Sequence, residues 1–376
     1  MSNNFLTPAE TANSFIGIGE YKAKMPFKKV LVSGFLAGAY IAFAAQLLTT
    51  VTQDMSGIFG VGFTSFIGGS VFGIALVLVL VAGSDLFTGN TLLSMAWLNG
   101  NLKTKQVLKN WSWVYFGNFI GAMFLLWLIY TANMWSAHEG AVGAKAVALA
   151  YKKTHLSFGE AFVRGMACNW LVCLAVIMVA SAQDTISKIA AAWFPVMAFI
   201  ASGFEHCVAN MFVIPAGITA SHNPVVFSAV TAAHPTWDLA SLNVSSFVFG
   251  NLIPVTLGNI FSGAVLVGGI YWFLYVKEEN KEYARLSIDW KPILNIVMTT
   301  PARVYTKIQS IDWKPILALF STAYAKIYTK IQSIDWKSIL ALFTTAPIKL
   351  YRNYRFTKLK MFRGIKLFKS HLHHRV

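Results

Sequence analysis

Long apolar segments alternate with short polar ones along this chain. A bilayer is crossed by about 20 apolar residues in a helix, and six segments reach that length. They cover residues 30–51, 62–98, 107–130, 158–182, 189–214 and 246–276. The second is too long for one span and too apolar for a loop, so we predict a break between Gly83 and Gly89. The pattern therefore predicts an all-α polytopic membrane protein with six transmembrane helices.

The fifth span contains a second expected break. Glu205 and His206 lie midway along it, directly after Gly203. Ionisable groups at that depth are costly and indicate function. The stretch GFEHCVAN also matches GSDLFTGN, 120 residues earlier, in which Gly83 and Asp85 occupy the corresponding positions. Two interrupted spans in corresponding halves predict an inverted 3+3 repeat with a transport site where the halves meet.

Other small and polar residues in the spans have structural interpretations. We predict that Glu205 and Asp85 cap the half-helix that follows each break. Closely spaced glycines recur in the spans, and we expect them to pack helices within one subunit rather than to form a dimer seam. These pairs are Gly34 with Gly38, Gly69 with Gly73, and Gly117 with Gly121.

Composition agrees with a membrane protein. Of the 376 residues, 56% are hydrophobic and only 12% are charged, whereas soluble domains carry about 25% charged residues. The lysines before the first span and between later spans fall on one side, which predicts cytoplasmic termini in the cell's inner membrane. Residues 133–157 are expected to form an outer loop whose lysines attract an anion. The three cysteines lie in apolar segments, so we predict no metal site and no cofactor.

Two regions flank the expected channel domain of residues 30–277. Residues 1–29 contain a predicted amphipathic helix on the cytoplasmic membrane surface. Residues 278–376 form a basic tail in which SIDWK recurs every 23 residues, and residues 277–376 supply +13 of the net charge of +16. The repeats could stack as a small cytoplasmic array or lie on anionic lipid, and the interleaved basic and aromatic residues favour lipid. Nucleic acid is not an expected partner for a tail tethered to a membrane.

Four motifs in order resemble one family. They are LFTGNT from Leu86, GMACNWLVCLAV from Gly165, SGFEHCVANMFVIPAG from Ser202 and NLIPVTLGNI from Asn251. They are similar to signature segments of the formate/nitrite transporter family over about residues 5–277. The resemblance implies a homopentamer in which each subunit has an aquaporin-like pore for small monovalent anions or their conjugate acids.

The resemblance also implies roles for individual residues. His206 matches the family's central histidine, Thr88 its loop threonine, Lys153 its outer-vestibule lysine and Asn169 its pore-side asparagine. Asn259, in the last motif, is a further candidate for the pore, although Asn169 and Asn259 could instead serve helix packing. The apolar constrictions match Phe72, Leu76, Leu86, Phe87, Val172 and Phe199. On periodicity alone, Phe72, Leu76 and Phe199 would be ordinary core residues.

These residues predict a proton-coupled route. A carboxylate cannot cheaply cross dry aromatic and aliphatic side chains, so we expect Lys153 to concentrate the anion and the substrate to cross as a neutral acid. His206 would bond the substrate or exchange a proton with it, since imidazoles ordinarily titrate near pH 6.5. Formate ranks first as substrate, with nitrite, hydrosulfide and lactate as alternatives.

Two other function classes were considered. An intramembrane enzyme is not expected, because the chain has no HExxH, GxSxG or GxxxxGK[ST] motif. A membrane scaffold that acts through the basic tail would leave the two ionisable breaks unexplained.

Overall fold

Helices make up almost all of the fold of residues 5–276, which are the residues that the computed structural model describes. The tail of residues 278–376, with its expected repeats, lies outside them. The α-helices are α1 (Pro8–Lys24), α2 (Phe27–Val51), α3 (Ser56–Phe72), α4 (Ile74–Leu80), α5 (Phe87–Asn90), α6 (Ser94–Leu98), α7 (Thr104–Thr131), α8 (Ala141–Thr154), α9 (Phe158–Ser181), α10 (Thr185–Ala201), α11 (Cys207–Ala220), α12 (Pro224–Ala233), α13 (Ile253–Phe261) and α14 (Ile270–Tyr275). Shorter 3₁₀ or π-helical turns are η1 (Thr91–Leu93), η2 (Met134–Ser136), η3 (Leu239–Ser241), η4 (Ser246–Leu252) and η5 (Ser262–Gly269).

Five of these helical stretches are long and apolar enough to cross a membrane. They are α2, the stretch Ser56–Leu80 formed by α3 and α4, α7, α9, and the stretch Ser246–Tyr275 that runs from η4 to α14. The expected fifth span consists instead of the shorter helices α10 and α11. The end of the expected second span is likewise divided into α5, η1 and α6. The count of long helices is thus five, and a sixth crossing requires α10 and α11 together.

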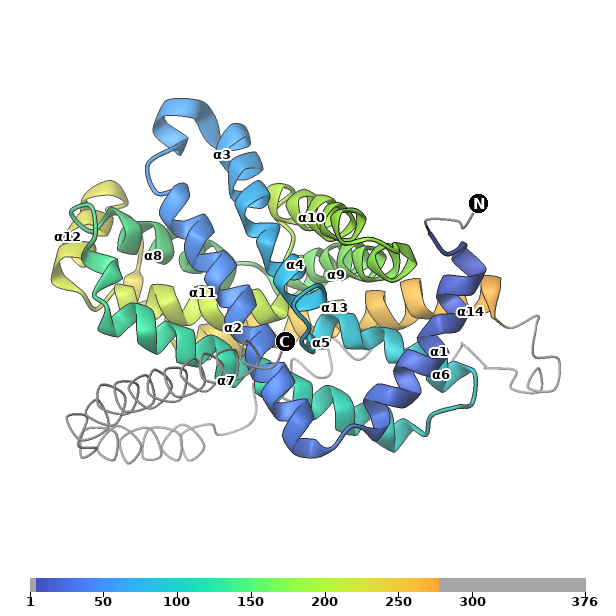
Figure 1. Ribbon diagram of the computed structural model, residues 1–376. Coiled ribbons are helices and arrows are strands. Elements are labelled where there is room, and N and C mark those ends of the chain that lie inside the picture. Colours follow the sequence, from blue (N-terminus) through green and yellow to red (C-terminus); the bar gives the residue numbers. More distant parts are fainter. Residues whose placement is uncertain (1–4, 277–376) are drawn as a thin grey trace, which may run out of the picture. The chain divides into compact units, whose positions relative to one another are not determined.

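The close contact of α2 with α7 depends on glycine (Figure 1). A Cβ atom at Gly38 would collide with the carbonyl oxygen of Asn118, and one at Gly121 would collide with that of Phe35. The expectation that these glycine pairs pack helices within one subunit is confirmed for the Gly34–Gly38 and Gly117–Gly121 pairs.

The N-terminal segment forms the expected helix. Thr7 and Glu10 make a capping box at the start of α1, and Pro8 occupies its first turn. The buried ring of Phe15 joins a small core with Leu92 and Met95. One face of α1 therefore packs on protein, near α6 and α14 and far from α8 and α12 (Figure 1).

The expectation of a loop over residues 133–157 is wrong. These residues contain η2 and the 14-residue helix α8. The sequence AVGAKAVALAYKKT is rich in alanine, a strong helix former, and buries Val142, Val147 and Ala150 on one face. The helix was missed because it is short and carries three lysines, which weakens its apolar signal.

Candidate functional site

The two chain interruptions meet inside the helical body. The first lies between α4 and α5 and the second between α10 and α11. Gly83 and Gly203 have φ angles of 92° and 72°, a conformation that side-chain-bearing residues rarely adopt. Beyond them, Thr88 Oγ1 lies 3.0 Å from His206 Nε2, and both residues are buried. The structure thus brings together the two polar residues that the sequence placed 118 positions apart.

His206 caps the helix that follows it. Its Nδ1 accepts the backbone N–H of Ala209 at 3.1 Å, so this nitrogen is unprotonated. The hydrogen-bond network therefore assigns the imidazole proton to Nε2, which donates to Thr88 Oγ1. The hydroxyl proton of Thr88 then remains available for another acceptor. An imidazolium would lose the bond from Ala209, because Nδ1 could no longer accept.

The prediction that Glu205 and Asp85 cap the half-helices is wrong. The cap of α11 is His206, and α5 begins at Leu86 without a side-chain cap. Glu205 instead pairs with Lys153, whose Nζ lies 2.7 Å from Glu205 Oε1. A carboxylate beside an ammonium is stabilised more by this charge than by helix N–H groups alone.

Asp85 makes the matching ion pair with Lys22, at 2.8 Å. The Lys22 ammonium also donates to Asn90. On the other side, Asn210 donates to Glu205 at 2.7 Å. Sequence reasoning missed Lys22, although a signal was present. Lys22 precedes Lys153 by 131 residues, the same offset that separates the starts of α2 and α9.

Two buried asparagines tie the interruptions to neighbouring helices. Asn118 accepts the N–H of Phe87 at 2.9 Å and donates to two carbonyl oxygens, those of Gly34 and Asp85. Asn259 accepts the N–H of Cys207 at 3.0 Å. It donates to the carbonyl oxygens of residues 165 and 205 at 2.7 and 3.1 Å. Both N–H groups of the Asn259 amide are used, so it has none to offer a substrate.

Asn169 has a different hydrogen-bond inventory. Its Nδ2 lies 2.7 Å from the carbonyl oxygen of Asn259, 3.2 Å from Thr91 Oγ1 and 3.3 Å from the carbonyl oxygen of Thr88. Its Oδ1 is buried and has no hydrogen-bond partner among the described residues. Asn169 is therefore left with an acceptor and no donor.

Apolar side chains enclose the Thr88–His206 pair. The Phe72 and Phe199 rings meet edge to face with centroids 6.2 Å apart. Phe199 also stacks on the His206 ring at 5.8 Å and 19°. The ring of Phe87 turns toward Tyr115, at 4.8 Å. All six predicted constriction residues are buried, namely Phe72, Leu76, Leu86, Phe87, Val172 and Phe199.

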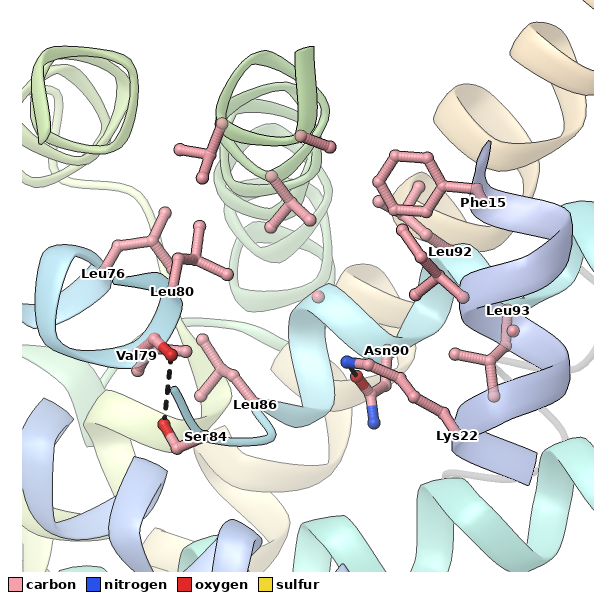
Figure 2. A pocket seen from close by; sticks show the side chains of 16 residues that line it. Phe15, Lys22, Leu76, Val79, Leu80, Ser84, Leu86, Asn90, Leu92 and Leu93 are labelled. Carbon is pink, nitrogen blue, oxygen red and sulfur yellow. Dashed lines mark hydrogen bonds between the residues drawn. The ribbon is translucent and has the colours of Figure 1, made fainter. Parts of the chain in front are cut away.

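A cavity of about 200 Å³ opens on one side of the first interruption. Figure 2 shows Leu76 and Leu86 on one of its sides, with Lys22 and Asn90 on another. Phe15 of α1 contributes to its wall, so the N-terminal helix covers part of it. The cavity is mostly apolar, and its polar side chains are the Lys22 ammonium, the Asn90 amide and the Ser84 hydroxyl. Among residues 5–276 no group of three His, Cys, Asp or Glu side chains could hold a metal ion.

Comparisons with known proteins agree with one another. The sequence model of a family described as "Formate/nitrite transporter" matches residues 9–273. The "Probable formate transporter" of Methanothermobacter thermautotrophicus is 40% identical over 295 residues, which is 74% of this chain and 100% of that protein. The "Formate channel FocA" of Haemophilus influenzae is 40% identical over 271 residues, 71% of this chain and 94% of that protein.

Solved structures match over the same region. One described as "Pentameric formate channel with formate bound" has a TM-score of 0.60 and 36% identity. The match covers 67% of this chain and 98% of the other. Another, "FNT family ion channel", has a TM-score of 0.59 and 30% identity, with 70% and 98% coverage.

Proposed function

This chain belongs to the formate/nitrite transporter family, and from that membership we propose that it passes formate, or formic acid, through an integral membrane channel. The family consists of channels and transporters rather than enzymes. The formate named for the relatives supports the substrate, and the pentameric structure supports a homopentamer. We place the channel in the cell's inner membrane with both termini in the cytoplasm, because the basic segments share one side.

We propose that the channel has six spans in an inverted 3+3 repeat, with the second and fifth spans broken. The corresponding hydrogen bonds support this arrangement. Asn118 and Asn259 each bind the backbone of an acidic residue inside one interruption and of the first residue of the helix that follows it. Lys22 and Lys153 each pair with the acid of one interruption. The residues that make these contacts occur in the same order in both halves, at sequence offsets of 131, 120 and 141 for the lysines, the acids and the asparagines. Two halves that repeat the same contacts in the same order are the pattern of an internal duplication.

The observation that carries the proposal is the buried Thr88–His206 contact beside the Phe72–Phe199 ring pair. A formate ion would have to shed its hydration to pass these rings, at a cost that no single contact returns. A neutral acid has a carbonyl oxygen that accepts one hydrogen bond and an O–H that donates one. Thr88 has a hydroxyl proton to donate, and Asn169 Oδ1 is an acceptor that has no partner in the part of the chain that the structure describes. These two unused groups complement formic acid.

Lys153 supplies positive charge on the approach to this site. Its Nζ donates one of three N–H groups to Glu205, and the other two have no partner among residues 5–276, so they are available to an anion. We propose that an anion bound there takes a proton from solvent and enters the constriction as the acid. His206 contributes by fixing the Thr88 hydroxyl, since its own Nδ1 is occupied as the helix cap.

We also propose that the basic tail binds anionic lipid. Residues 277–376 supply +13 of the net charge, and basic segments with interleaved aromatic residues bind anionic membrane surfaces. Lipid binding by the tail is a separate function from conduction.

Stopped-flow uptake into proteoliposomes tests the channel proposal. Formate, nitrite, hydrosulfide and lactate are compared at two external pH values in the parent, in His206→Ala and in His222→Ala. His222 is an exposed histidine that contacts only its own helix turn, so it is the matched control. We expect formate flux that rises as external pH falls, is reduced in His206→Ala and is unchanged in His222→Ala. No flux above that of empty liposomes would refute the proposal, and faster flux of another anion would replace formate as the substrate.

A further inference from the structure

Four aromatic rings form a column at the end of α8. His155 stacks on Tyr151 with centroids 3.8 Å apart, and Tyr151 stacks on Trp237 at 4.2 Å with an angle of 4°. Trp237 in turn stacks on His234 at 3.9 Å and 7°. We call these four residues the ring column. Two of them belong to the end of α8 and two to the segment of residues 234–245 between α12 and η4, so the column joins these elements.

Hydrogen bonds reinforce the same junction. His155 Nδ1 lies 2.7 Å from the carbonyl oxygen of Tyr151, and Nε2 lies 3.2 Å from Ser241 Oγ. Ser241 Oγ donates to the carbonyl oxygen of Asp238 at 2.6 Å, which holds the turn that contains it. His155 is the C-cap residue, directly after Thr154 at the end of α8. The last turn of α8 is therefore fastened to the 234–245 segment by both ring contacts and hydrogen bonds.

Lys153 lies inside this fastened turn. It is two residues from Tyr151 and two from His155 along the chain. Its carbonyl oxygen accepts a hydrogen bond from Asn251 Nδ2 at 2.9 Å, and Asn251 belongs to η4, directly after the 234–245 segment. The backbone of Lys153 is thus bound by η4, while the residues on either side of it are bound by the ring column. Little freedom remains for the turn that carries the Lys153 ammonium to Glu205.

We propose that the ring column is a positioning clamp that holds Lys153 where it receives the anion. The inference rests on the proposed function of Lys153 and names residues that act through it. Charged neighbours do not explain the junction. Lys152 on α8, Asp238 in the 234–245 segment and Glu160 at the start of α9 make no ion pair across it among the described residues. Aromatic contact therefore replaces ionic contact here, and it is not screened by salt.

The clamp predicts a specific kinetic effect. Removing the Trp237 ring frees the end of α8 without altering the Thr88–His206 site. The ammonium of Lys153 is then less often in place, so the formate concentration at half-maximal flux rises. We expect a rise of about two- to tenfold, the range that an aromatic pair contributes. The flux at saturating formate stays within about twofold of the parent, because the constriction is unchanged.

Concentration-dependent formate uptake is measured in proteoliposomes for the parent, Trp237→Ala, Trp237→Phe, Lys153→Gln and the double variant Trp237→Ala with Lys153→Gln. Phe227→Ala removes an exposed ring from α12 at the same end of the molecule and is the matched control. Trp237→Phe keeps a ring in the column and should restore at least half of the loss. In the Lys153→Gln background, Trp237→Ala should have no further effect. Ser241→Ala, which removes only the bonds of one hydroxyl, serves as a milder variant if Trp237→Ala fails to fold.

Several outcomes would overturn the clamp. The half-saturating formate concentration could be unchanged in both Trp237→Ala and Ser241→Ala, or Trp237→Ala could lower only the flux at saturating formate. The effects of Trp237→Ala and Lys153→Gln could add in the double variant, or Phe227→Ala could raise the half-saturating concentration as much as Trp237→Ala does. Failure of the proposed function gives a different result. If Lys153→Gln leaves the half-saturating concentration unchanged, then Lys153 does not receive the anion, whatever the Trp237 variants show.

Discussion

Replacing Asn259 by alanine should destabilise the protein rather than remove a substrate contact. The Asn259 amide satisfies Cys207 N–H and the carbonyl oxygen of Glu205. Cys207 is the first residue of α11, and the first N–H groups of a helix have no partner within it. Glu205 lies in the interruption itself, outside any helix. Both groups would be left buried and unsatisfied.

The magnitude follows from these contacts. Each orphaned buried group costs about 1–3 kcal/mol, and the further bond to the carbonyl oxygen of Gly165 contributes about 1 kcal/mol. The loss is about 3–7 kcal/mol, which is large beside the about 5–15 kcal/mol that stabilises a typical domain. We expect the unfolding midpoint of Asn259→Ala in detergent to fall by about 6 °C or more. Asn118→Ala removes the corresponding bonds at the first interruption and should show a similar fall.

Thermal unfolding and formate flux, measured on the same preparations, separate the two roles of Asn259. Asn243→Ala is the comparison, because that asparagine is exposed and its side chain bonds only Ala240 and Ser246 among the described residues. The loss of such a cap costs about 1 kcal/mol, less than the loss expected for Asn259→Ala. A structural Asn259 gives a lower midpoint, with flux retained by the fraction that stays folded at low temperature. A midpoint equal to that of the parent together with abolished flux would refute this reasoning and assign Asn259 to the substrate.

Two further predictions concern the ends of the chain. The hydrogen bond from Asn101 and the charge of Lys24 lower the pKa of Glu20 in the folded protein. The Glu20 carboxylate therefore stabilises the docked position of α1 above the unfolded-state pKa of about 4.3. This stabilisation is lost as the pH falls through the lower pKa of the folded state. A fluorescent probe on α1 should therefore report a small loosening in acid, with α1 still held by the Phe15 core and the Lys22–Asp85 pair, and Asn101→Ala should weaken this pH dependence. Deleting residues 278–376 should leave formate flux intact and abolish any rise in unfolding midpoint on adding phosphatidylglycerol. Loss of flux on deletion would show that the tail serves conduction.

Much of the fold follows from apolar length and glycine placement. The long helices begin within about six residues of the expected spans, because continuous apolar sequence and helix length are local properties. Both interruptions were found from Gly83 and Gly203, and the positive φ angles explain why glycine occurs there. Helix α8 was missed, since three lysines in fourteen residues give it the composition of a loop.

The side-chain partners were less accessible to sequence reasoning. Lys22 and Asp85 are 63 residues apart, and nothing local to either residue indicates the other. Capping was assigned to Glu205 because carboxylates suit helix N-termini, but the nearby Lys153 ammonium binds that carboxylate and leaves the cap to His206. Local preference was overridden in this case by a charge from a distant segment.

The two proposed halves match at the residues that hold the backbone in place and differ at the residues proposed to contact the substrate. Five positions carry the same kind of residue in both halves, and these residues bind the backbone or one another. The pairs are Lys22 and Lys153, Asp85 and Glu205, Asn90 and Asn210, Asn110 and Asn251, and Asn118 and Asn259. The central residues have no such match.

At the same offsets, His206 corresponds to Leu86, Thr88 to Val208 and Asn169 to Gly38. A symmetric scaffold fixes where the two interruptions meet, but symmetry alone would supply two leucines or two histidines there. Only the departures from symmetry supply the hydroxyl donor and the amide acceptor that we propose for the apolar constriction. Lys153 belongs to the matched set, so its proposed role toward the anion depends on the two N–H donors that have no partner among residues 5–276. Variants of the unmatched residues should therefore change flux more than stability, and variants of the matched asparagines should do the reverse.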